Sequence, residues 1–172
     1  MLDNIGKSVI ISVLWFCSFN ATALEMKTEN INTLYITVAL PDDLTIMSDS
    51  LIEIKYPSKN RPQVVYSNES GSVSFGVSEK NKPDLIHLDE VKDVMLESMK
   101  VLNPKASPLT VDGHNAWLIT FKSQAIDSKI LNMQLITMTD KKFLIATFNM
   151  TEKNIGKYHD IGVLSLSSIK FN

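Results

Sequence analysis

Alternating apolar and polar positions indicate β-strands in the first half of the chain. In residues 72–78, Val73, Phe75 and Val77 alternate with serine and glycine. A period of two places the large side chains on one face of a strand and the small ones on the other. Residues 34–40 and 63–67 are rich in strand-forming residues and stop at turn signals. Residues 51–56 also alternate and predict a strand, whereas the polar residues 25–33 predict a loose lead-in.

The period changes to that of a helix after residue 84. Apolar residues at positions 88, 91, 94, 95 and 102 recur at spacings of three and four, with charged residues on the opposite side. This spacing predicts one amphipathic helix over residues 88–102. Asn103 and Pro104 follow it, and we expect the helix to end there because proline disfavours helical conformation in the preceding residue.

A second group of strands follows the helix. Residues 109–111 lead into Asp112-Gly113, a strong signal for a hairpin turn. Residues 115–123, 129–139 and 143–150 are three further strand candidates. Thr151 has the character of an N-cap for a second helix, and residues 167–171 are a candidate for a short last strand.

The predicted order is therefore strands, helix, strands, helix. Strands that are joined by tight turns pair antiparallel, and helices that interrupt groups of strands indicate an α+β domain. We expect a twisted antiparallel sheet with a helix on each face or with both helices on one side.

The first 23 residues have the pattern of a signal peptide. Lys7 and the amino terminus supply positive charge, residues 8–19 form a short apolar run, and Ala-Thr-Ala at 21–23 is typical of a cleavage site. We expect cleavage after Ala23, a single domain over residues 24–172, and a periplasmic location. Two alternatives are an uncleaved N-terminal anchor and lipid attachment at Cys17, although bulky residues precede that cysteine.

Composition excludes several classes of protein. The 172 residues are 44% hydrophobic and 21% charged, which excludes disorder for most of the chain. A net charge of −2 provides no basic excess for binding nucleic acid. Only the N-terminal apolar run approaches the length of a membrane span, so we expect no stable membrane insertion after cleavage. The single cysteine lies in the same run, so the mature domain would have no disulfide or thiolate metal site.

Motifs that carry catalysis are absent from the sequence. It contains no G-x-S-x-G, no G-x-G-x-x-G and no Walker sequence. The histidines at positions 87, 114 and 159 are far apart, and only His87 with Asp89 and Glu90 offers a loose metal-binding alternative. We therefore predict no catalytic residues, no metal and no cofactor, and hence no enzyme.

Residues 55–66 form the most distinctive segment. Arg61 is the only arginine in the chain, two prolines stiffen the segment, and tyrosines stand near both ends. Arginine and tyrosine are enriched at interface hot spots, and a stiff loop loses little entropy on docking. We predict a rigid basic and aromatic contact loop with Tyr56, Lys59, Arg61 and Tyr66 as partner-binding residues. The alternative is an ordinary surface turn in which Arg61 is solvated or pairs within the chain.

The order of these motifs resembles that of the PsbP-like superfamily, which includes Mog and the envelope protein DcrB. The resemblance rests on Leu40-Pro41 at a strand end, the central helix 88–102, the hairpin 111–121 with its G-x-x-A…F pattern, and the closing Ser168-Ile169-Lys170. It covers roughly residues 31–172. It implies an α-β-α sandwich with a non-catalytic binding role.

Compartment, size and resemblance together predict a periplasmic protein-binding module. The specific hypothesis is an immunity protein that neutralises a secreted bacterial toxin. The alternatives are a general DcrB-like envelope protein and a carrier of a small ligand, which would need a deep pocket between sheet and helix.

Overall fold

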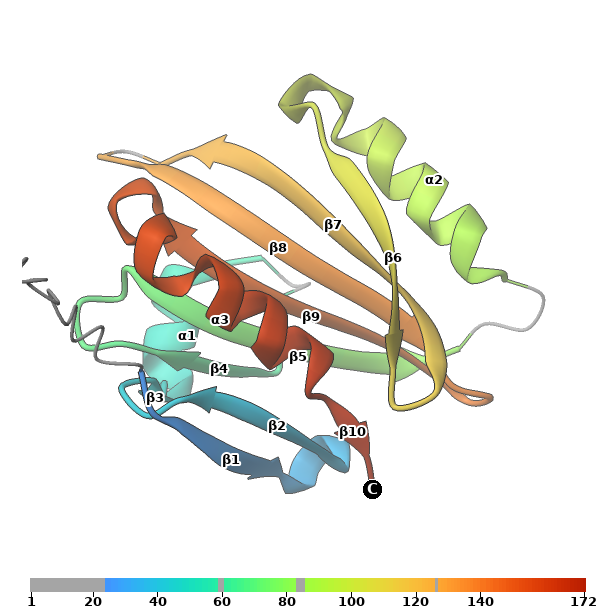
Figure 1. Cartoon of the computed structure of the whole chain (residues 1–172), viewed down its shortest axis with the longest axis horizontal. Coiled ribbons are helices and arrows are strands. Elements are labelled where there is room, and N and C mark those ends of the chain that lie inside the picture. The colour runs from blue at the N-terminus through green and yellow to red at the C-terminus, as the bar shows by residue number, and fades with distance from the viewer. Residues whose placement is uncertain (1–23, 59–60, 83–85, 126) are drawn as a thin grey trace, which may run out of the picture.

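The computed structural model describes residues 24–172 except residues 59–60, 83–85 and 126 (Figure 1). The predicted signal peptide, its cleavage after Ala23 and the lipidation alternative at Cys17 lie outside the described residues and stay predictions. In the described part of the chain, no helix is long and apolar enough to cross a bilayer.

A seven-stranded antiparallel sheet forms the centre of the molecule. Its strand order is β3-β4-β5-β9-β8-β7-β6, so consecutive hairpins place β8 and β9 in the middle. The Asp112-Gly113 turn has φ angles of 48° and 79°, as the tight hairpin between β6 and β7 requires. The strands are β3 (Thr45–Ile46), β4 (Val64–Ser67), β5 (Val73–Asn81), β6 (Lys105–Val111), β7 (His114–Gln124), β8 (Lys129–Met138) and β9 (Lys142–Thr151).

A separate three-stranded sheet joins the two ends of the domain. It consists of β1 (Met26–Ile31), β2 (Ile36–Pro41) and the short β10 (Lys170–Phe171), with β2 in the middle. The prediction of a loose lead-in over residues 25–33 is wrong, because most of that segment is β1. Its polar composition gave no strand signal. Charged residues such as Lys27 and Glu29 are nevertheless common on edge strands.

The predicted strand over residues 51–56 is also wrong, because the chain forms the helix α1 (Asp49–Lys55) there. Period two and the helical period cannot be distinguished over six residues. Ser48 occupies the N-cap position, Asp49 lies in the first turn, and the following Pro57 limits the helix to seven residues. Only Ile52 of the side chains described in this helix is buried.

The two longer helices lie on opposite faces of the large sheet (Figure 1). α3 (Ile155–Ser167) packs on β8, β9 and β2, beside the small sheet, whereas α2 (Leu88–Ser98) lies over β6 and β8. Three 3₁₀ turns complete the chain: η1 (Asn32–Leu34), η2 (Lys100–Leu102) and η3 (Glu152–Asn154). The fold is thus the predicted α+β sandwich with a helix on each face.

The two faces of the large sheet are stabilised differently. The face toward α3 and the small sheet carries the main core, in which Phe75, Met133 and Phe148 are completely buried. By contrast, α2 has no fully buried residue. It is held to β7 by polar contacts of Trp117, whose Nε1 donates to Asp89 at 2.7 Å and whose ring lies 4.4 Å from the Lys92 ammonium.

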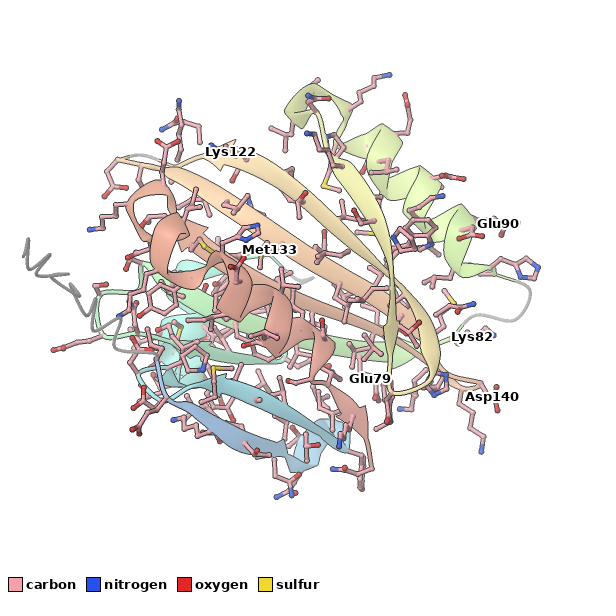
Figure 2. The ribbon with its side chains drawn as sticks, in the orientation of Figure 1. Glu79, Lys82, Glu90, Lys122, Met133 and Asp140 are labelled. Carbon is pink, nitrogen blue, oxygen red and sulfur yellow. The ribbon has the colours of Figure 1, made fainter. Side chains whose placement is uncertain are left out.

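Gly162 sets the distance between α3 and the sheet. A Cβ at this position would lie 2.4 Å from Cε of Met133 and 2.8 Å from Cδ1 of Phe148. Figure 2 shows Met133 beneath α3, where the helix crosses the middle of the sheet. The glycine therefore allows α3 to lie closer to the sheet than it could with a larger residue at this position.

We expect Gly162→Ala to lower the free energy of unfolding by about 1–3 kcal/mol, because the added methyl group overpacks the core. Gly156→Ala is the matched control in the same helix, since a Cβ there meets nothing within 4 Å. It should raise the free energy of unfolding by a few tenths to about 1 kcal/mol. Urea denaturation of both variants tests this, and equal effects of the two substitutions would contradict the packing role of Gly162.

Tyr158 makes the stability of the fold sensitive to alkaline pH. Its side chain is buried on α3, and its hydroxyl donates a hydrogen bond to Asp43. Burial, this hydrogen bond and the charges of Asp43 and Asp42 raise the pKa of Tyr158 well above the ordinary 10.0. A pKa that is higher in the folded chain contributes stability that is complete below the unfolded value and is lost as the pH rises above it.

We therefore expect the free energy of unfolding to fall above about pH 10, because tyrosine ionises first in the unfolded chain. Tyr158→Phe should make this fall less steep. Part of the slope should remain, because burial and Glu29 raise the pKa of Tyr66 as well. Urea denaturation at a series of pH values measures the slope, and an identical slope in Tyr158→Phe would exclude this role.

Candidate partner-binding surface

Two surface hollows adjoin each other at α1. One, of about 420 Å³, lies between η1, β3, β4 and α1. The other, of about 410 Å³, lies between α1 and the start of β4. They share Asp49, Ile52 and Gln63, so they adjoin each other. We call this region the α1 surface and define it by Ile46, Asp49, Ile52, Glu53, Arg61 and Gln63.

The α1 surface exposes one large apolar side chain, Ile46 on β3, which is 67% exposed and lines the first hollow. Leu51 on α1 is 55% exposed as well, but it lines neither hollow. Exposed apolar groups beside polar ones are characteristic of protein contact sites. β3 has only two residues, so it pairs with only part of β4, and the rest of β4 has no strand partner at this edge of the sheet.

Arg61 lies at the rim of the second hollow. Its guanidinium donates to Oε1 of Glu53 at 2.9 Å, and 39% of its side chain is exposed. The pair leaves other N–H groups of the guanidinium on the surface, where they can reach a carboxylate of a partner. The intramolecular pairing that the sequence left open as an alternative is therefore present, and a contact role for Arg61 stays a prediction.

The two predicted tyrosines lie on opposite faces of the large sheet. Tyr66 is paired with Phe75 on β5, lines the first hollow and is 5% exposed. Its hydroxyl lies 3.4 Å from Oε2 of Glu29, and burial and that carboxylate raise the pKa of Tyr66. Tyr56 instead lies 3.4 Å from Ser74 on the other face. Tyr66 thus lines the first hollow and Arg61 the second, whereas Tyr56 lines neither.

Lys59 falls outside the described residues, so its predicted role stays a prediction. Sequence reasoning missed Ile46, which it assigned to no element, and it interpreted residues 51–56, which include Leu51, as a strand. An amphipathic helix before Pro57 was the signal that could have placed Leu51 on the surface. The burial of Tyr66 follows from its pairing with Phe75, which no local pattern reveals.

The acidic residues suggested as loose metal ligands at the start of α2 instead make hydrogen bonds within the fold. Glu90 accepts a hydrogen bond from the backbone N–H of His87, and Asp89 accepts one from Trp117. Within the part of the chain that the structure describes, no group of three histidine, cysteine or carboxylate side chains has the geometry of a metal site.

Sequence comparison finds no relatives, whereas structure comparison does. No protein-family model matches the chain, and no curated protein is similar to it. PsbP (CyanoP) of Synechocystis has a TM-score of 0.62 at 14% identity over 92% of this chain and 99% of its own. LpqN of Mycobacterium tuberculosis, described as involved in cell envelope biogenesis, has a TM-score of 0.59 at 12% identity over 86% of this chain and 90% of its own.

A protein of Bacteroides thetaiotaomicron has a TM-score of 0.53 at 12% identity; the match covers 80% of this chain and 45% of that protein. At these identities the comparisons show the fold alone. The chain therefore has the PsbP-like fold, and the resemblance seen in the order of its sequence motifs is confirmed at that level.

We expect Arg61→Ala to change the free energy of unfolding by less than about 0.5 kcal/mol, because an exposed ion pair contributes little. Thermal and urea denaturation of Arg61→Ala and Glu53→Ala measure this. A loss several times larger in either variant would assign the pair a structural role. A small loss makes Arg61→Ala suitable as a probe of binding.

Proposed function

We propose that this chain is a non-catalytic binding protein of the bacterial envelope that contacts a protein partner through the α1 surface. The observation that carries the proposal is the exposure of Ile46 in the first of two adjoining hollows, the second of which is lined by Arg61. This combination of apolar centre and charged rim is typical of interfaces in which a few side chains provide most of the affinity.

Two further observations support a role in the envelope. The N-terminal sequence has the pattern of an export signal. LpqN, a protein of envelope biogenesis, has the same fold. The specific hypothesis of an immunity protein, which neutralises a secreted toxin arriving in the periplasm, remains the finer form of this proposal. A general DcrB-like envelope role is its alternative.

The proposal is tested by site-specific photo-crosslinking in the producing cells. A photoreactive residue at position 46 should capture one discrete protein, because Ile46 is exposed and lines the first hollow. The matched control is position 164 on α3, where Leu164 is similarly exposed at 61%. Arg61→Ala should weaken binding of the captured partner by on the order of 2 kcal/mol.

Equal capture at both positions, or no capture at position 46, would contradict the α1 surface as a partner site. The identity of the captured protein tests the finer hypothesis. A secreted toxin whose activity the purified chain inhibits would support immunity. A resident envelope protein would exclude it and support the general envelope role.

A further inference from the structure

The middle of the large sheet has a polar face that the main core does not use. On this face β5 presents Ser74, Gly76 and Ser78, in register with side chains of β9. The helix on this side, α2, lies toward β6 and β8. A cleft of about 410 Å³ remains over the central strands; its lining includes Tyr56, Pro62, Gln134, Ile145, Thr147 and Asn149. We call it the sheet cleft.

The wall of the sheet cleft is fixed by direct contacts with its floor. A Cβ on Gly76 would lie 3.1 Å from Cγ of Pro62 and 3.2 Å from Oγ1 of Thr147, so the proline rests directly on the glycine. The backbone N–H of Gln63 donates to the carbonyl of Val77 at 2.9 Å. These contacts preform the cleft, which reduces the ordering that a ligand must cause.

Asn149 is the most unusual group in the sheet cleft. Its Oδ1 is buried and accepts no hydrogen bond from the described residues. A buried acceptor without a donor lowers stability, so its presence calls for an explanation such as a ligand. A half-turn about the broad χ2 torsion exchanges the oxygen and the amide nitrogen of this side chain, so either atom can be turned toward the cleft.

The lining chemistry favours a ligand with many hydroxyl groups. The lining contains the amides of Gln134 and Asn149, three hydroxyl residues and no carboxylate, and its one charged residue, Lys80, is exposed. Each amide offers an N–H donor beside a C=O acceptor, which matches neighbouring hydroxyls that also donate and accept. Tyr56, Pro62 and Ile145 provide apolar surface for the C–H groups of a sugar ring. We propose that the sheet cleft binds a neutral pyranose unit, held by Gln134, Thr147 and Asn149.

The sheet cleft shares only Pro62 with the two hollows of the α1 surface, so the residues that hold the sugar can be changed without altering that surface. The test is a titration of the full chain with chitobiose, an envelope-type amino sugar, and with maltose, a free neutral sugar. Calorimetry gives the dissociation constant, and ¹H–¹⁵N spectra report the side-chain amides of Asn149 and Gln134. We expect saturable binding of at least one sugar at millimolar concentrations or below, with shifts of both side-chain amides.

Asn149→Leu and Gln134→Leu should each weaken sugar binding about tenfold or more, because the matching donor and acceptor are lost. The control is Asn81→Leu, the same substitution at the exposed end of β5 on the other face. Asn149→Leu should also keep or raise the unfolding midpoint, since it removes an unsatisfied acceptor. This second readout separates loss of a ligand contact from loss of folding.

Several results would overturn the assignment. One is the absence of saturable binding of both sugars, and another is affinity that Asn149→Leu leaves unchanged. Tighter binding of an acetylated diglycine amide, with shifts of the same two amides, would assign the cleft to peptide rather than sugar. Because position 46 does not line the cleft, failure here leaves the partner-binding proposal to be judged separately by crosslinking.

Discussion

The close approach of α3 to the sheet at Gly162 is the contact on which the rest of the fold depends. Glycine inside a helix costs about 1 kcal/mol relative to alanine, so its use there reflects a packing requirement. Met133 and Phe148 fill the space that a Cβ would need. The same approach buries Tyr158 and Leu166 of α3 in the core cluster. It also brings Ser168 within 2.8 Å of the backbone N–H of Ala39 in β2.

One consequence is a division of roles between the two faces of the sheet. Because α3 and the small sheet bury the large side chains of β5, β8 and β9, most of the hydrophobic stabilisation lies on that face. The opposite face is not required to exclude water along its whole length. Serine, threonine and amide side chains can therefore occupy it without cost to the core. On the part of this face near α2, Ile119 and Ile136 are completely buried, and Trp117 adds polar contacts to the helix.

Sequence patterns predicted the parts of the fold in which local and tertiary signals agree. Val73, Phe75 and Val77 alternate because one side of β5 faces the core, and Asp112-Gly113 marks a hairpin because both residues adopt positive φ. The prediction failed where a segment was short or contained few apolar residues. α1 is too short for its period to be distinguished, and β1 is an edge strand without an apolar face. The candidate sites were less predictable still, because the burial of Tyr66 and of Asn149 Oδ1 depends on strand pairing that is distant in sequence.

The segment between α1 and β4 contributes residues to both the sheet cleft and the α1 surface. Lys55 donates to the carbonyl of Gly71 at 2.8 Å, and burial lowers the pKa of this lysine. Further along, Gln63 accepts from the backbone N–H of Glu79 at 2.7 Å. The segment is thus fastened to both ends of β5, with Tyr56 toward the sheet cleft and Arg61 toward α1. Since β5 belongs to the rigid centre of the sheet, both surfaces are supported by the most stable part of the fold. An aromatic and basic loop that sequence reasoning interprets as a single contact therefore divides, in three dimensions, between two faces.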